Sequence, residues 1–327
     1  MITRRTDYRH VSSDGPISAA IGYFDGFHEG HLQLINEAIA QAGKRGIHSA
    51  IITFDPDPWT VFKPDANRDH LLEQDEKERF AKALGADELI IIDFSKEFAS
   101  LSPEKFHQML RDLGVKNLVC GFDFTYGYKG SGSPQTLKNQ KDFDVEVIDS
   151  VNDDKGKISS SRIESLIRQG EVAKAGELLG YFYSIAGTVE HGFKRGSRLL
   201  GFPTANIRVP DQIVLPEKGV YAGYAETDGK IYPCMINVGR NPTFENEKIS
   251  IEGNLFDFDQ DLYGKKIRYF FAARIRPEQK FSSPELLRKQ LEKDRNETRK
   301  LLARKQPILQ PTLRLWSLNP DFVIMHA

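Results

Sequence analysis

The chain has 327 residues, the length of about two domains. Lys and Arg number 45 against 46 Asp and Glu, so the net charge is -1, and this balance gives no support to a general nucleic-acid-binding protein. The N-terminal segment MITRRTDYRH has no apolar run behind its arginines, and no apolar run approaches the roughly 20 residues of a membrane span. We therefore expect a cytoplasmic protein with no nucleic-acid or membrane partner.

The two cysteines, Cys120 and Cys234, both lie in apolar runs that are typical of strands. They are far apart in the sequence, and no spacing typical of metal ligands surrounds them. We expect two buried free thiols in a reducing compartment.

The first half of the chain alternates between short apolar runs and amphipathic segments. The apolar runs predict buried strands at residues 17–21, 49–54, 88–94, 117–124 and 145–149. The segments between them predict helices at 32–42, 73–84 and 103–113, and two short helices are expected within 158–180. This alternation favours an α/β fold with a doubly wound parallel sheet, which is a Rossmann-like domain.

The pattern changes near residues 180–184. Runs rich in Tyr, Val and Ile follow at short spacing, and Asp228-Gly229 between two of them indicates a hairpin. These runs predict a small antiparallel β-barrel, followed by one terminal helix at about 283–303. We therefore expect domains at 1–182 and 183–305, and leave the tail at 306–327 unassigned.

The first candidate site is the motif GYFDGFHEGH at residues 22–31. It follows the first predicted strand and opens the first helix, where glycines let the backbone approach a phosphate and free N–H groups attract an anion. His28 and His31 stand three residues apart at this helix start, so both can point at a triphosphate. A glycine-rich turn with incidental histidines is the alternative, and the position between strand and helix favours the phosphate site.

The second candidate site is the motif LGFPTAN at residues 200–206. Thr204 and Asn206 flank Ala205, and in an extended segment both can face the same side. A hydroxyl and an amide carbonyl are oxygen donors that suit the hard magnesium ion. A turn cap after Pro203 is the plainer interpretation of the same two residues.

In this order the two motifs resemble those of the bifunctional bacterial riboflavin kinase/FAD synthetase family, over residues of roughly 17–303. The resemblance implies that the C-terminal domain phosphorylates riboflavin with ATP. It also implies that the N-terminal domain transfers AMP from a second ATP to FMN and releases pyrophosphate. The implied cofactor is Mg2+, with ATP as co-substrate and riboflavin, FMN and FAD as substrates and products; the oligomeric state stays open.

The resemblance implies roles for residues of the synthetase domain. His28 and His31 would be catalytic, because hydrogen-bond donors aimed at the phosphate oxygens stabilise charge that develops there. Further contacts with nucleotide or phosphate are implied for Gly22, Phe24, Asp25, Gly30, Asp123, Ser160, Ser161 and Arg162.

In the kinase domain, Glu252 aligns with the family's catalytic base, which accepts the proton of the riboflavin 5′-hydroxyl. Thr204 and Asn206 would bind magnesium beside ATP, and Gly192 and Gly196 would let their loop fold over the nucleotide. Taken alone, Glu252 is an exposed strand carboxylate; the surrounding match favours the catalytic role.

The chain departs from the family pattern at Tyr23, where the family usually has Asn, and at Asp57, where a histidine is often found. The bulky side chain of Tyr23 beside the predicted phosphate site would lower the rate of adenylylation, change the specificity of the reaction or point away from the site. Because of Tyr23, a chain that retains only the kinase activity is one alternative. A flavin-sensing regulator or RNA-binding protein that keeps the fold without turnover is a second, and a cytidylyltransferase-like enzyme acting on another phosphate substrate is a third.

Overall fold

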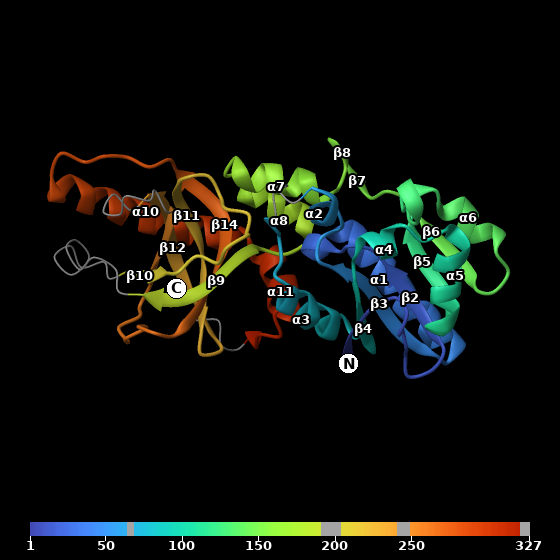
Figure 1. The fold of residues 1–327 in the computed structure, drawn as a ribbon. Coiled ribbons are helices and arrows are strands. Elements are labelled where there is room, and N and C mark those ends of the chain that lie inside the picture. Colours follow the sequence, from blue (N-terminus) through green and yellow to red (C-terminus); the bar gives the residue numbers. More distant parts are fainter. Residues whose placement is uncertain (64–68, 191–203, 241–248, 321–327) are drawn as a thin grey trace. The chain divides into compact units, whose positions relative to one another are not determined.

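The computed structural model describes residues 1–63, 69–190, 204–240 and 249–320. The chain divides into two compact units, Met1–Ser160 and Ser161–Ala327. Figure 1 shows a sheet flanked by helices in the first unit and a barrel with a long helix in the second. The predicted fold class, a parallel α/β sheet followed by an antiparallel barrel and a terminal helix, is confirmed.

The first unit is built on a six-stranded sheet in the order β1-β4-β3-β2-β5-β6. All neighbouring strands are parallel. The chain runs from β2 to β3 and β4 on one side, then returns to β5 and β6 on the other, so its direction reverses beside β2. The strands are β1 (Ile2–Thr6), β2 (Ile17–Ile21), β3 (His48–Asp55), β4 (Glu88–Asp93), β5 (Val115–Gly121) and β6 (Asp144–Ile148).

Helices connect these strands and begin and end at the expected signals. Ser102 caps the start of α5 with its side chain, and α1 ends at Gly46 in a left-handed conformation with φ of 65°. The helices of this unit are α1 (Glu29–Arg45), α2 (Pro58–Phe62), α3 (Gln74–Leu84), α4 (Lys96–Ala99), α5 (Pro103–Asp112) and α6 (Pro134–Asn139). Two 3-10 turns, η1 (Asp25–Phe27) and η2 (Tyr128–Gly130), and a short hairpin, β7 (Asn152–Asp153) and β8 (Gly156–Lys157), complete it.

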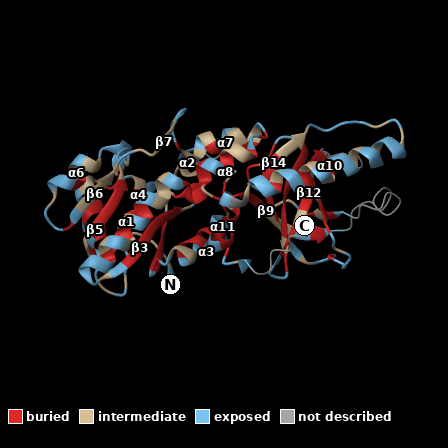
Figure 2. Cartoon of the chain, turned by 180° about the vertical axis from the view of Figure 1, so that it is seen from behind, coloured by how far each residue is buried: buried red, intermediate tan, exposed pale blue. Residues whose placement is uncertain are grey.

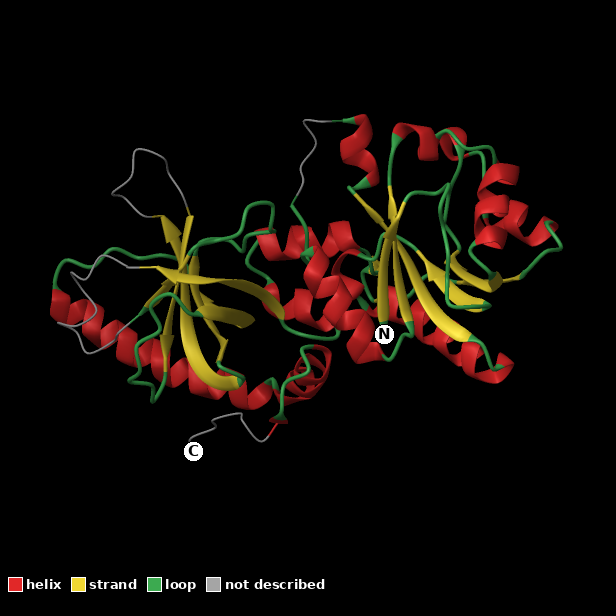
Figure 3. Cartoon of the chain, turned by 60° about the horizontal axis from the view of Figure 1, so that its bottom comes forward, coloured by secondary structure: helices red, strands yellow, loops and turns green. Residues whose placement is uncertain are grey.

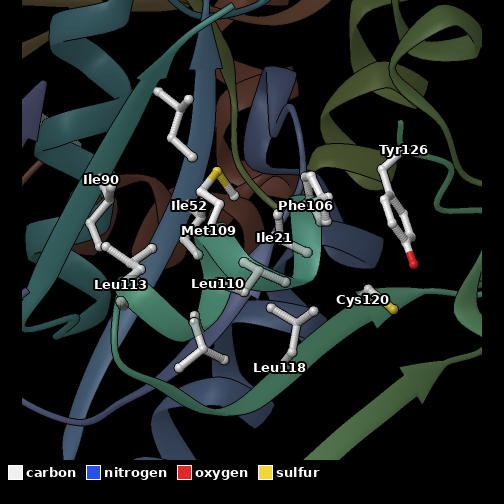
Figure 4. Packing of buried hydrophobic residues seen from close by; sticks show 14 of the residues in the cluster. Ile21, Ile52, Ile90, Phe106, Met109, Leu110, Leu113, Leu118, Cys120 and Tyr126 are labelled. Carbon is white, nitrogen blue, oxygen red and sulfur yellow. The ribbon is translucent and has the colours of Figure 1, made fainter. Parts of the chain in front are cut away.

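One core cluster of the first unit lies between the sheet and helix α5. Ile21, Ile52 and Ile90 come from three adjacent strands and pack in one cluster with Phe106 and Met109 of α5 (Figure 4). Each such side chain contributes about 1.5–3 kcal/mol when it is fully buried. Figure 2 shows that buried residues lie on the strands of the sheet and, in the second unit, on the strands of the barrel.

The second unit is a closed antiparallel barrel in the order β10-β13-β12-β11-β14-β9. Its strands are β9 (Tyr183–Glu190), β10 (Ala205–Ile207), β11 (Gly219–Thr227), β12 (Lys230–Arg240), β13 (Ile249–Leu255) and β14 (Lys266–Arg276). Helices α7 (Ser160–Arg168) and α8 (Val172–Leu179) precede the barrel, and α10 (Pro284–Arg304) runs along it (Figure 3). Both cysteines, one in each unit, are buried and free as expected.

Within residues 306–327, for which the sequence predicts no element, Gln306–Leu315 form a further helix, α11. Trp316, directly after it, is buried against Phe270 of β14, and the guanidinium of Arg268 lies 3.6 Å from the centroid of its ring. The Thr312 hydroxyl accepts the backbone N–H of Phe182 at 2.9 Å. The described part of the tail is therefore packed on the barrel.

Helix α10 is tied to strand β14 by a shielded ion pair. Arg276, the last residue of β14, donates from Nη2 and Nε to the Asp294 carboxylate at 2.8 and 3.0 Å. Gln290, one turn earlier in α10, donates to the same carboxylate at 2.8 Å. The Asp294 side chain is 2% exposed and that of Arg276 is 16% exposed, so removal of one partner would strand the other charge away from water.

We expect Asp294→Ala to lower the free energy of unfolding of the barrel unit by about 2–4 kcal/mol, because Arg276 would keep a shielded charge without its partner. Urea unfolding followed by circular dichroism measures the change. The control is Glu297→Ala on the same helix, which removes an exposed 3.8 Å ion pair with Lys300 and should have little effect. Equal effects of the two substitutions would contradict the expectation.

Candidate functional site

The turn between β2 and α1 has an unusual backbone. Phe24 and Phe27 have positive φ values of 53° and 39°, which non-glycine residues adopt uncommonly, and Gly26 between them has φ of 80°. Both phenylalanine side chains are only 1% exposed, so their burial helps to hold this conformation. Ser160 donates a hydrogen bond to the Asp25 carbonyl at 2.9 Å and braces the turn.

This turn delivers two stacked histidines to the start of α1. The rings of His28 and His31 lie parallel within 19°, with their centroids 3.6 Å apart. His28 caps the helix, since its Nδ1 accepts the backbone N–H of His31 at 3.3 Å. Gly30 lies close beneath: a Cβ there would approach Cε1 of His28 to 3.1 Å. The motif thus places both imidazoles at the N-terminus of α1.

Both histidines are neutral near pH 7. Burial, and next the charge of Lys157, lower the pKa of His28 to about 4. Burial also holds the pKa of His31 well below its usual range, with smaller contributions from His28, Lys77 and Lys157. The positive charge of Lys157 therefore acts on both imidazoles, and that of Lys77 acts on His31.

Asp25 and Lys77 are two buried charged residues near the stacked histidines. The Asp25 carboxylate accepts the backbone N–H groups of Leu71 and Leu72 at 3.0 and 3.2 Å. Burial raises the pKa of Asp25, and the Lys77 charge opposes this rise. Burial lowers the pKa of Lys77, whose Nζ donates to the Tyr23 carbonyl at 3.3 Å. Asp25 thus holds the segment that precedes α3 against the turn between β2 and α1.

The two departures from the family pattern, Tyr23 and Asp57, contact each other. The Tyr23 hydroxyl donates to the Asp57 carboxylate and lies 3.1 Å from Nδ1 of His70. Its ring meets Trp59 edge-on at 4.7 Å, and the ammonium of Lys77 is 4.1 Å from its centroid. The ring is therefore engaged with residues that follow β3 and with α3.

Asp123 follows β5, the neighbour of β2, so it lies at the same carboxyl edge of the sheet as the histidine turn. Lys157 donates to its carboxylate and lies 4.8 Å from the ring centroid of Phe122, which is 45% exposed. The first unit thus brings together Gly22, Phe24, Asp25, His28, Gly30, His31 and Ser160, with Asp123 joined to them through Lys157. Ser161 and Arg162 lie in the first turn of α7 and belong to the second unit.

The second cluster lies on the β10–β13 pair of the barrel. Asn206 of β10 is directly opposite Glu252 of β13. The side chain of Asn206 donates to the Glu252 carboxylate, and the Thr204 hydroxyl lies 3.5 Å from the same carboxylate. Burial raises the pKa of Glu252, and these two hydrogen bonds oppose the rise. Three residues that the sequence singled out therefore meet at one place.

Other predicted residues of this cluster, Gly192 and Gly196, lie outside the described residues. Among residues 1–63, 69–190, 204–240 and 249–320, no group of three or more His, Cys, Asp or Glu side chains is placed to hold a metal ion. In the same ranges no helix is both long and apolar enough to cross a membrane.

Comparison with known proteins assigns each unit to a family. A family model for FAD synthetase matches residues 11–162, and a model for riboflavin kinase matches residues 179–302. The bifunctional riboflavin kinase/FMN adenylyltransferase of Listeria monocytogenes is 40% identical, over 87% of this chain and 92% of its own. The chain belongs to this bifunctional family. It therefore phosphorylates riboflavin and adenylylates FMN.

Other relatives agree with the family assignment. The bifunctional enzymes of Bacillus subtilis and Escherichia coli K12 are 40% and 32% identical, over 85% and 88% of this chain and 90% and 93% of their own. A solved structure described as a macrolide-efflux protein from Streptococcus pneumoniae superposes with a TM-score of 0.86 at 37% identity, covering 91% of this chain and 99% of its own. The fold of that protein therefore extends over both units.

Sequence reasoning missed three residues at these clusters. Lys77 lies in an amphipathic helix, and Lys157 precedes the serines of α7; in both cases the sequence signal was only a charge in a polar segment. Tyr269 of β14 hydrogen-bonds across the barrel to Ala205, and only the closed barrel brings these residues together. Inward alternation along β14 was the one available signal for Tyr269.

We expect acid to destabilise the protein through His28. Because its pKa falls from 6.5 to about 4 on folding, the unfolded chain binds a proton that the folded chain does not bind in this window. The contribution of His28 to the free energy of unfolding is therefore fully present above pH 6.5. It falls by about 2–3 kcal/mol as the pH is lowered towards 4.5.

Urea unfolding at a series of pH values measures this loss. His28→Asn, which retains a side chain suited to the helix cap, should flatten the profile between these pH values. His10→Asn, which removes an exposed histidine, is the control. An unchanged slope in His28→Asn would contradict the expectation.

Proposed function

We propose that each reaction is carried out by one side-chain cluster within one domain. A domain at residues 1–182 would adenylylate FMN, and a domain at 183–305 would phosphorylate riboflavin. The observation that carries this division is the meeting of Glu252, Asn206 and Thr204 in the barrel unit, while both histidines lie in the other unit.

Glu252 is the proposed general base for phosphorylation. Its burial raises the pKa of the carboxyl group, which makes the ionised form a stronger base than an exposed glutamate. The carboxylate accepts the proton of the riboflavin 5′-hydroxyl while that oxygen attacks the γ-phosphorus of ATP, and ADP leaves. The hydrogen bonds from Thr204 and Asn206 orient the carboxylate for this transfer.

Thr204 and Asn206 are the proposed ligands of Mg2+. A hydroxyl and an amide oxygen beside a carboxylate form an all-oxygen donor set, which fits this hard cation. When bound, the ion supplies positive charge to the ATP phosphates. Gly192 and Gly196 would cover the nucleotide in the same domain.

His28 and His31 are proposed to stabilise the triphosphate during adenylylation. An oxygen of the FMN phosphate attacks the α-phosphorus of ATP and pyrophosphate leaves, so no protein nucleophile is needed. Each neutral imidazole has one N–H to donate, and Lys77 and Lys157 add positive charge nearby. Donors fixed in a water-poor corner stabilise charge as it develops.

Other predicted residues complete this nucleotide site in the proposal. Gly22 and Gly30 allow close approach of the phosphates, and Asp123 lies at the substrate side of the same sheet edge. Ser160, Ser161 and Arg162 add donors from the start of α7. Phe24 and Asp25 are buried, so we assign their contribution to the shape of the turn.

We expect Glu252→Gln and Thr204→Ala each to lower the rate of FMN formation by at least about 100-fold, because the base or the metal ligand is lost. Adenylylation of added FMN should persist in both variants. The measurement is chromatography of flavins after incubation with magnesium, ATP and either riboflavin or FMN. Loss of both activities in a folded variant would sink the two-site proposal.

We expect the double variant His28→Ala/His31→Ala to lose FAD formation by about 100-fold or more while riboflavin phosphorylation persists, because donors to the triphosphate are removed. The same chromatographic assay measures both products from one sample. Its internal control is the kinase activity of the same chain. Unchanged FAD formation would remove the histidines from the catalytic assignment.

A further inference from the structure

A buried tyrosine contacts both strands that carry the proposed kinase residues. Tyr269 lies on β14 and has 0% exposure. Its hydroxyl donates a hydrogen bond to the Ala205 carbonyl of β10 at 2.7 Å and accepts the backbone N–H of Gly253 in β13 at 3.1 Å. Since β14 lies between β11 and β9 in the barrel, these bonds cross the interior.

The two backbone groups that Tyr269 joins belong to one rung of the β10–β13 ladder. Ala205 is directly opposite Gly253, and the next rung pairs Asn206 with Glu252. Strand β10 has three residues, so few ladder bonds fix its register. A slip of one residue would turn Asn206 to the other face of the sheet, away from Glu252.

Gly253 leaves the space that Tyr269 needs. A Cβ at this position would lie 2.2 Å from Cε1 and 2.6 Å from the hydroxyl oxygen of Tyr269, which no side chain tolerates. The absence of a side chain at Gly253, the residue next to Glu252, therefore makes room for the ring of Tyr269.

We propose that Tyr269 is a positioning residue for riboflavin phosphorylation, because its hydroxyl fixes the register of Thr204 and Asn206 against Glu252. This inference rests on the roles proposed above for those three residues. Without the hydroxyl, the Ala205 carbonyl and the Gly253 N–H lose a buried partner, which costs more than loss of an exposed bond. Displacement of reacting groups by about 1 Å is enough to slow a reaction about 100-fold.

The test is Tyr269→Phe in the full chain, with Tyr224→Phe as its matched control. Tyr224 lies on the adjacent strand β11 and also has 0% exposure, and its hydroxyl has no hydrogen-bond partner among the described residues. We expect Tyr269→Phe to lower kcat for riboflavin phosphorylation by about 10- to 100-fold at a temperature well below its Tm. The KM for riboflavin and the rate of FMN adenylylation should stay unchanged, and Tyr224→Phe should keep the full kcat.

A merely structural role would lower Tm and leave kcat of the folded protein intact, and this result would overturn the proposal. Gly253→Ala is the second test, since it keeps the hydroxyl but displaces the ring. The same loss of kcat is expected in this variant, and full kcat would also overturn the proposal. If Glu252→Gln kept full riboflavin phosphorylation while Tyr269→Phe lost it, the proposed catalytic role of Glu252 would be wrong.

Discussion

The burial of strand β2 is the constraint on which the first site depends. All five residues, Ile17–Ile21, are buried, so the strand needs neighbours on both edges and cover on both faces. The chain adds β3 and β4 on one side of β2 and then β5 and β6 on the other. The connections that leave β2 and β5 therefore meet at the carboxyl end of β2. The segments that carry His28 and Asp123 lie almost a hundred residues apart in sequence, and they share one sheet edge for this reason.

Burial shifts the pKa values in opposite directions at the two candidate sites. Removal from water favours the neutral form of any titratable group. At the start of α1, burial lowers the pKa of His28 and His31, so both side chains are uncharged beside two lysines. In the barrel it raises the pKa of Glu252, so its ionised form is more basic. The fold therefore sets the chemistry of both clusters through burial, and the hydrogen bonds from Thr204 and Asn206 limit the effect at Glu252.

Sequence patterns were enough for the long elements and for the place of the histidine motif between β2 and α1. Strand β2 at 17–21 matches its prediction fully, and α10 at Pro284–Arg304 matches the predicted terminal helix within one residue at each end. Strand β1 was missed because it is an exposed edge strand held by backbone pairing with β4, with no apolar alternation to mark it. Helix α11 was missed because it contains Pro311, which disfavours helix on its own. Burial of Trp316 and Leu313 accompanies the helix despite this preference. The contact of Tyr23 with Asp57 was also beyond a local pattern, since it joins the ends of two strands.

The neutral state of the stacked histidines would tie the binding of an anion at the start of α1 to proton uptake. A polyphosphate bound at their corner would raise both pKa values towards their ordinary range, because an opposite charge favours the protonated imidazole. By linkage, the apparent affinity for such an anion then increases as the pH falls, and each proton taken up is drawn from the buffer. The heat of such binding would then include the ionisation enthalpy of the buffer, and it would differ between two buffers of the same pH.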